Sequence, residues 1–296
     1  MGHERVDSTV ARVRVQTAGT AGVSDRGRWF RSMRVTSRER LGEQYADDAR
    51  LTLRQETHRR YSERPDNTPE WVLGLLASGP GELVLDAGAG NGAYHPALRS
   101  RGVRIVAVER EMGMIRSVSE RTAAYVAGDV TALPLPTDAV DHSMANHMLY
   151  HVPDIPGALM ELARVTRSGG RVALTTNGDR RESPLQQLHE RAARELGIDA
   201  DVTITTDRFG DHNLGQVQRV FPDAAKFEQV NALVFPTAEP VLAYYGSGPV
   251  DSVREPTADT RRELVTRMDE LVRQRIAADG EFRIPKRVVC YLATAP

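Results

Sequence analysis

Short apolar runs of strand length alternate with longer amphipathic segments through the middle of the chain. The five runs are residues 83–85, 103–108, 124–127, 139–145 and 171–176. Between the last two, apolar residues share one helical face, with Asp154 as a capping residue before the segment and Gly169 and Gly170 after it. Strands that alternate with helices of this length favour a parallel sheet covered on both faces. The pattern therefore predicts a doubly wound α/β core.

The patterns on either side of this core predict further elements. On the N-terminal side, helices are expected from about Arg40 to Glu63 and from Pro69 to Leu76. After Asn177 the expected elements are a helix over 181–196, an irregular stretch over 197–214, a strand over 227–235, a helix over 260–279 and a strand over 287–293. Thr260 and Glu263 would form a capping box at the start of the long helix. The two late strands would complete a seven-stranded, mostly parallel sheet.

The composition is that of a water-soluble globular protein. Hydrophobic residues make up 40% of the chain, the mean hydropathy is −0.42 and the formal net charge is −1. The chain as a whole therefore has no field to hold a polyanion. Residues 1–40 are a local exception, with nine arginines against four acids, and we expect them to form a basic, flexible arm. No run approaches the roughly 20 apolar residues of a membrane span, no secretory signal is recognised, and Cys290 has no partner for a disulfide, so we expect a cytoplasmic protein.

A glycine-rich turn follows the first of the five runs. Asp86 is followed by Gly88, Gly90 and Gly92, and glycines at such a turn let the backbone approach a ligand closely. A dinucleotide-binding turn has the spacing G-x-G-x-x-G, and this one is a residue shorter. The carboxylate of Asp86 also suits a cationic amine better than a pyrophosphate. The turn therefore favours a ligand that carries an amino acid.

Four segments in order resemble the motifs of class I S-adenosylmethionine-dependent methyltransferases, in the branch that acts on small molecules. They are Asp86 to Gly92, Val106 to Glu109, Ala127 to Val130, and Asn146 to Asp154. The resemblance implies that S-adenosylmethionine is the cofactor. It also implies that Glu109, beside Arg110, binds the two ribose hydroxyls and that Asp129, beside Val130, lies near the adenine amine. The cofactor-binding residues expected on this basis are Asp86, Gly88, Gly90, Gly92, Glu109, Arg110, Asp129, Val130, Asn146, Tyr45 and Arg54.

The resemblance also suggests how the chain divides and which side chains take part in chemistry. Residues 41–296 would be one methyltransferase domain, in which N-terminal helices (41–80) form a lid over the cofactor and precede a cofactor-binding core (81–178). A substrate-covering insertion (179–250) and a C-terminal helix and strand (251–296) would follow. His151 is the candidate base for the acceptor's proton and His147 a weaker candidate, because a histidine titrates near neutrality. No acidic cluster completes a metal site with these two histidines, so no metal is expected.

Methyl transfer to an oxygen or nitrogen atom of a small molecule is the leading functional hypothesis, with carbon less favoured. A specialised metabolite would be a typical acceptor for this branch. Nucleic acid is not the expected partner, but an RNA methyltransferase that uses the arginine-rich arm stays open as an alternative. A non-catalytic module that binds the cofactor is a second alternative. The sequence leaves the oligomeric state open.

Overall fold

The computed structural model describes residues 49–111, 113–114, 123–179, 181, 183–200, 205–254 and 256–296. These residues belong to one compact unit that spans Leu41–Pro296. The predicted basic arm and Tyr45 lie outside the described residues.

Seven strands form a single sheet in the order β3-β2-β1-β4-β5-β7-β6. Their bounds are β1 Leu83–Ala87, β2 Arg104–Glu109, β3 Ala124–Ala127, β4 His142–Asn146, β5 Arg171–Asn177, β6 Ala225–Phe235 and β7 Phe282–Thr294. The first five strands run parallel, whereas β7 is antiparallel to both β5 and β6. The predicted seven-stranded, mostly parallel α/β fold is therefore confirmed.

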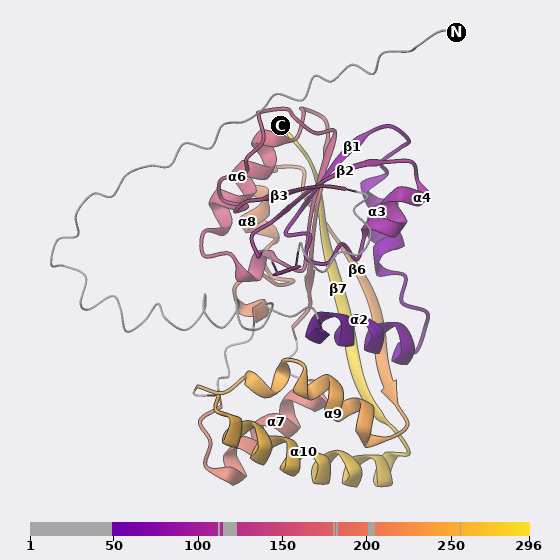
Figure 1. Ribbon diagram of the computed structural model, residues 1–296, viewed down its shortest axis with the longest axis vertical. Coiled ribbons are helices and arrows are strands. Elements are labelled where there is room, and N and C mark those ends of the chain that lie inside the picture. Colours follow the sequence, from indigo (N-terminus) through magenta and orange to yellow (C-terminus); the bar gives the residue numbers. More distant parts are fainter. Residues whose placement is uncertain are drawn as a thin grey trace, which may run out of the picture. The chain divides into compact units, whose positions relative to one another are not determined.

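The helices cover both faces of the sheet and one end of it (Figure 1). Their bounds are α2 Ala49–Tyr61, α3 Thr68–Leu76, α4 His95–Ser100, η1 Leu149–His151, α6 Ile155–Val165, α7 Pro184–Leu196, η2 Thr205–Asp207, α8 Leu214–Gln218, α9 Ala238–Gly246, η3 Pro249–Asp251 and α10 Ala258–Asp279. α6 buries its predicted apolar face on one side of the sheet, and α3 and α4 pack on the other. Asp154 accepts a hydrogen bond from the Gly157 amide at 3.0 Å, as expected of a helix cap.

The predicted capping box of Thr260 and Glu263 is wrong. α10 begins at Ala258, because Thr257 is the cap: its hydroxyl accepts from the Thr260 amide at 3.1 Å, and its own amide donates to the Thr260 hydroxyl at 2.7 Å. Thr260 therefore occupies the third helical position and not the cap.

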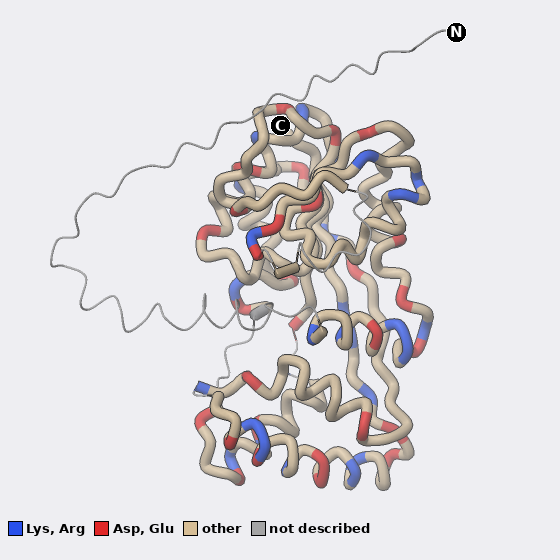
Figure 2. The backbone as a smooth tube through the Cα atoms, viewed as in Figure 1, with Lys and Arg blue, Asp and Glu red and all other residues tan. Residues whose placement is uncertain are grey.

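A third apolar cluster lies at the end of the sheet that β6 and β7 extend beyond their neighbours. Here α7, α9 and α10 pack on one another and on the ends of these two strands (Figure 1). We call α7, α9, α10 and η3 the helical cap. Its exposed faces carry mixed charge (Figure 2), and pairs such as Arg273 with Asp269 and Arg275 with Asp279 stand one helical turn apart. Among the described residues, no helix combines the length and apolarity that crossing a membrane requires.

Candidate functional site

The glycine turn after β1 has a backbone that only glycine adopts easily. Gly88, Gly90 and Gly92 have φ angles of 69°, 55° and 75°, in the left-handed region that disfavours residues with a Cβ. Side chains also press on the turn from outside. A Cβ on Gly92 would lie 2.7 Å from His95 Nδ1, and one on Gly88 would lie 2.8 Å from Met148 Cγ. The surrounding side chains thus pack directly against the backbone of the turn.

Asp86 is buried behind this turn, with only 3% of its surface exposed. Its Oδ2 lies 3.0 Å from Nε2 of His95, and Nδ1 of His95 lies 3.2 Å from the hydroxyl of Tyr125. The predicted contact between Asp86 and a cationic amine stays a prediction, since the carboxylate faces His95. The sequence analysis missed His95 and Tyr125. A signal for His95 existed, as a histidine three residues after Gly92 stands at the start of the next helix.

Glu109, the last residue of β2, is fixed against the glycine turn. Its Oε2 accepts from the Gly90 amide at 2.9 Å, and its Oε1 accepts from the amides of Arg110 and Glu111 at 2.7 and 2.9 Å. A carboxylate offers about four lone-pair positions, so acceptor capacity remains after these three bonds. The side chain of Arg110 turns to Glu111, with Nε 3.1 Å from Oε1.

The third predicted segment joins this group through the backbone. The amide of Gly128 donates to the carbonyl oxygen of Glu109 at 3.1 Å. Asp129 orders the turn that follows, because its Oδ1 accepts from both the amide and the hydroxyl of Thr131, at 3.0 and 2.8 Å. Val130 is 5% exposed and packs into the core, so its side chain supports the turn from within.

The end of β4 carries an unsatisfied polar group. Both amide atoms of the Asn146 side chain are buried, and neither has a hydrogen-bond partner among the described residues. Leaving such a group unpaired costs about 1–3 kcal/mol, which native proteins accept where a ligand or water completes the bonding. His147 follows with a φ of 53°, a strained conformation that often occurs at functional sites. The backbone amide of His147 donates to the carbonyl oxygen of Thr175 at 2.8 Å.

His151 lies in η1, just beyond β4. Burial, together with the positive charges of Arg54, Arg208 and Arg110, lowers its pKa to about 4. The ring is therefore neutral near pH 7 and is a weaker base than an exposed histidine. Arg208 also fastens this segment, since its Nη2 donates to the carbonyl oxygen of Val152 at 3.1 Å.

α2 connects the glycine turn to the helical cap. Gln55 and Asn91 exchange two side-chain hydrogen bonds, both of 3.0 Å, and a Cβ on Gly90 would lie 3.7 Å from Leu51 Cδ2. At the other side, Nη1 of Arg54 donates to the carbonyl oxygen of Ser247 at 2.9 Å. The helix thus lies against the turn where the sequence analysis expected a lid. The predicted role of Arg54 in cofactor binding stays a prediction.

A family profile described as a methyltransferase domain matches residues 85–174. This range contains the glycine turn, Glu109, Asn146 and His151. Residues 85–174 of this chain thus match a methyltransferase domain, and they lie within the seven-stranded sheet described above. The match agrees with S-adenosylmethionine, the cofactor that the motif resemblance implied.

Curated relatives match only part of this chain, and the matching region is only part of each relative. A malonyl-[acyl-carrier protein] O-methyltransferase of Pectobacterium atrosepticum is 33% identical over 157 residues, which are 52% of this chain and 59% of that protein. A demethylmenaquinone methyltransferase of Mycobacterium marinum is 40% identical over 99 residues, or 33% of this chain and 43% of that protein. The chain thus spans about half the length of the curated relatives it matches.

Solved structures share the fold at low sequence identity. The phosphoethanolamine N-methyltransferase 2 of Haemonchus contortus in complex with S-adenosyl-L-methionine has a TM-score of 0.55 at 15% identity, covering 88% of this chain and 60% of that chain. The [4+2]-cyclase SpnF has a TM-score of 0.50 at 14% identity, covering 86% of this chain and 96% of that chain. Since a cyclase also has this fold, the acceptor chemistry must be argued from side chains.

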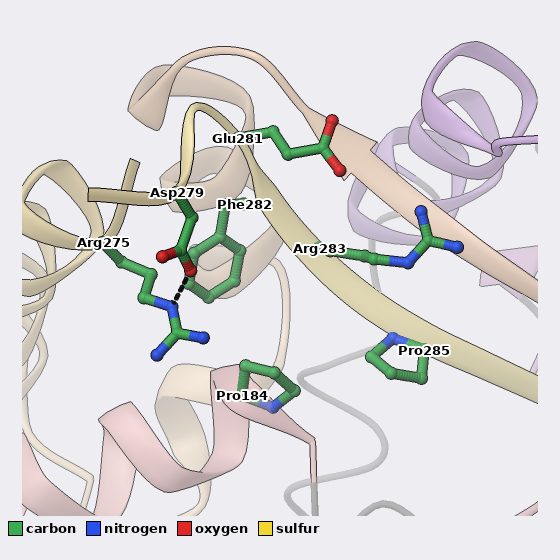
Figure 3. Close-up of a pocket in the computed structure, with 7 residues that line it drawn as sticks. All are labelled: Pro184, Arg275, Asp279, Glu281, Phe282, Arg283 and Pro285. Atoms are coloured by element: carbon green, nitrogen blue, oxygen red, sulfur yellow. Dashed lines mark ion pairs between the residues drawn. The ribbon is translucent and has the colours of Figure 1, made fainter. Parts of the chain in front are cut away.

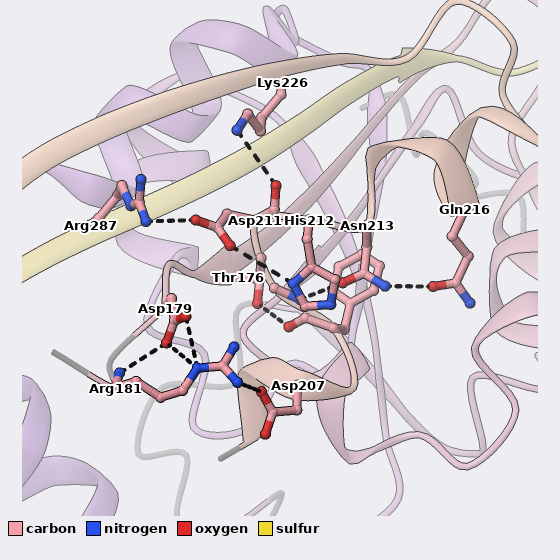
Figure 4. A network of polar contacts seen from close by, with 12 residues as sticks. Thr176, Asp179, Arg181, Asp207, Asp211, His212, Asn213, Gln216, Lys226 and Arg287 are labelled. Atoms are coloured by element: carbon pink, nitrogen blue, oxygen red, sulfur yellow. Dashed lines mark hydrogen bonds and ion pairs between the residues drawn. The ribbon is translucent and has the colours of Figure 1, made fainter. Parts of the chain in front are cut away.

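A polar network beyond β5 fixes the segment that carries Arg208 in the methyltransferase domain (Figure 4). The hydroxyl of Thr176 donates to the carbonyl oxygen of Phe209 at 2.7 Å, and Nη2 of Arg287 lies 2.6 Å from Oδ2 of Asp211. Arg181 pairs with Asp179 and Asp207 at 3.0 and 3.3 Å. These contacts hold the segment 205–213 at the carboxyl end of β5, next to η1.

A hollow of about 300 Å³ lies elsewhere in the molecule (Figure 3). Its walls come from α7, the end of α10 and the start of β7: Pro184, Arg275, Asp279, Glu281, Phe282, Arg283 and Pro285. None of these residues belongs to the glycine turn or to the carboxyl ends of β1 to β4. We therefore assign it no part in the methyltransferase site.

Proposed function

We propose that this chain is an enzyme that transfers the methyl group of S-adenosylmethionine to an oxygen or nitrogen atom of a small-molecule acceptor. The observation that carries the proposal is the buried, unpaired amide of Asn146, at the sheet edge where the glycine turn and Glu109 also lie. A bound cofactor would give that amide the partners it lacks.

The residues of this edge fit S-adenosylmethionine. Glu109 retains acceptor capacity for the ribose diol, Asn146 offers one donor group and one acceptor, and the glycine turn leaves room for a close approach. When bound, the cofactor supplies a methyl group on a sulfonium, which an aligned lone pair displaces. The protein then contributes alignment, exclusion of water and a place for the acceptor's proton.

His151 and the charges near it favour an oxygen acceptor over nitrogen. The neutral ring accepts the hydroxyl proton at one of its nitrogens, and the positive charges of Arg54, Arg208 and Arg110 stabilise the oxyanion that remains. The names of the Serratia marcescens and Pectobacterium atrosepticum relatives specify an O-methyltransferase, which agrees with this preference. α2 lies against the glycine turn through Gln55 and Leu51.

Calorimetric titration with S-adenosylhomocysteine tests the cofactor part of the proposal. We expect micromolar binding by the full chain, a loss of at least tenfold in Glu109→Ala, and no change in the matched variant Glu111→Ala, two residues further on. A folded protein that binds neither S-adenosylmethionine nor S-adenosylhomocysteine would contradict the proposal.

A screen of hydroxyl, carboxyl and amine acceptors with radiolabelled S-adenosylmethionine tests the transfer. We expect His151→Gln to lower turnover by roughly 10²-fold while the cofactor affinity stays within twofold, as for loss of a general base. Cofactor binding without transfer to any acceptor would instead identify a binding module. Transfer to RNA that depends on residues 1–40 would overturn the small-molecule assignment.

A further inference from the structure

Three polar side chains, two of them buried and the third partly buried, form a continuous hydrogen-bonded series behind the glycine turn. Asp86 comes from β1, His95 is the first residue of α4, and Tyr125 lies on β3. The two contacts measure 3.0 Å (Asp86 Oδ2 to His95 Nε2) and 3.2 Å (His95 Nδ1 to Tyr125 Oη). Asp86 and His95 are each 3% exposed, so solvent does not supply partners for them.

The hydrogen-bonding properties of the three side chains determine where the protons lie along this series of contacts. An ionised carboxylate only accepts, so His95 donates from Nε2 to Asp86. Nδ1 of the neutral ring is then an acceptor, and the Tyr125 hydroxyl donates to it. Burial raises the pKa of Tyr125 to about 12, and the charges of Asp86 and Glu109 act in the same direction, so the phenol keeps its proton at neutral pH. Tyr94, also next to Asp86, is buried and has a raised pKa for the same reason.

The side chains of His95 and Tyr125 also set the position of the glycine-turn backbone. A Cβ on Gly92 would lie 2.7 Å from Nδ1 of His95 and 2.8 Å from the Tyr125 hydroxyl, so the turn rests directly on this pair. An ionised carboxylate is costly to bury unless it is hydrogen-bonded, and an apolar residue would avoid that cost. Here the fold provides two further polar side chains to keep Asp86 charged beneath the turn. The free-energy cost of burying this carboxylate is explained if its charge attracts a ligand that lies on the turn.

We propose that His95 and Tyr125 are positioning residues that hold the Asp86 carboxylate fixed and ionised behind the glycine turn. In this way they set the affinity of the turn for the positively charged amino-acid end of the cofactor. The inference rests on the proposed function. The two side chains act through Asp86 and the backbone of Gly92, and neither is required to touch the cofactor.

Two ligands separate this role from a general structural one. S-adenosylhomocysteine carries the amino acid, whereas 5′-methylthioadenosine has the same nucleoside thioether without it. In calorimetric titrations of the full chain, we expect Tyr125→Phe and His95→Leu to weaken S-adenosylhomocysteine by tenfold or more. Both variants should leave the affinity for methylthioadenosine within twofold.

Two further variants control for lost hydrogen bonds. His95→Gln retains a donor for Asp86 and an acceptor for Tyr125, so it should recover most of the S-adenosylhomocysteine affinity. Tyr291→Phe removes the hydroxyl of a fully buried tyrosine, which donates to the Gly210 carbonyl oxygen at 2.6 Å, and should not change the ratio of the two affinities. In ¹⁵N-histidine spectra of the full chain, the signal absent from His95→Gln should be a neutral ring protonated on Nε2.

The outcomes distinguish the two proposals. Failure of the unsubstituted protein to bind either ligand overturns the proposed function. Binding of both ligands, with Tyr125→Phe and His95→Leu weakening the two equally or not at all, overturns this inference alone. A ring that is charged at neutral pH, or protonated only on Nδ1, would also overturn it.

Discussion

The glycine-turn region and the helical cap use buried residues in opposite ways. Around the turn, the fold buries a carboxylate, a histidine and an unpaired amide, and it holds three glycines and His147 at positive φ. The helical cap instead buries mainly apolar side chains such as Leu271, satisfies its one buried histidine among the described residues, His189, with two hydrogen bonds, and carries its charges outside as paired residues. The cap therefore provides stability, while the turn region accepts local cost for a binding site.

A cavity in the helical cap should have the largest effect on stability. Leu271 on α10 is 2% exposed and packs in the cap's apolar cluster. Leu271→Ala should lower the free energy of unfolding by about 2–5 kcal/mol, measured by urea denaturation. The affinity for S-adenosylhomocysteine, titrated where the variant is folded, should stay within twofold. A large loss of that affinity would mean that the helical cap contributes to ligand binding as well as to stability.

A pair of glycine substitutions compares the regions directly. Gly92 and Gly280, the latter at the end of α10, have similar φ angles of 75° and 84°, but a Cβ on Gly280 meets nothing within 4 Å. Gly280→Ala should cost about 1–2 kcal/mol for the left-handed conformation alone. Gly92→Ala adds the clash with His95 and Tyr125, for a total of about 2–4 kcal/mol, and should abolish measurable cofactor binding. Equal effects of both variants on binding would contradict this.

The parallel strands and helix faces were predictable, because their periodicity is local. The helix predicted over 260–279 is present within α10, and it buries one face formed by Leu264, Met268, Leu271 and Val272. The full length of β7 was not: the predicted strand covered residues 287–293, whereas β7 begins at Phe282 and contains Pro285. It is tolerated because β7 has only β6 as a neighbour there.

The candidate site likewise has one part that the sequence predicted and another that depends on the folded arrangement. The glycine turn and Glu109 belong to one strand–turn–helix–strand unit and were found from spacing. The contact of His95 with Tyr125 joins residues 30 positions apart, and only the placement of β3 beside β2 creates it. The bonds of α2 to Asn91 and Ser247 likewise join residues 36 and 193 positions apart.

The stability of the turn region should depend on pH through His151. Its pKa falls from 6.5 to about 4 on folding, so the unfolded chain binds more protons between these values. The stabilisation is fully present above about pH 6.5 and is lost as the pH falls toward 4. Between pH 7 and 5, urea unfolding should show a loss of about 2 kcal/mol that His151→Gln abolishes. An unchanged slope in the variant would assign the loss to other groups.

The smallest expected effect is at the cap of α10, and it tests whether the two regions are coupled. Thr257→Ala should cost about 1 kcal/mol of stability, since it removes the acceptor for the Thr260 amide. Thr266→Ala in the same helix is the matched control and should be nearly neutral, because alanine is a good helix former. A physical route to the site exists: Arg261 in the first turn of α10 pairs with Asp251 at 2.6 Å, and Asp251 lies 3.5 Å from Arg50 on α2. These are partly exposed ion pairs of little individual strength, so we expect the affinity for S-adenosylhomocysteine to stay within twofold. A drop of threefold or more in Thr257→Ala, without one in Thr266→Ala, would show that α2 transmits the state of the helical cap to the glycine turn.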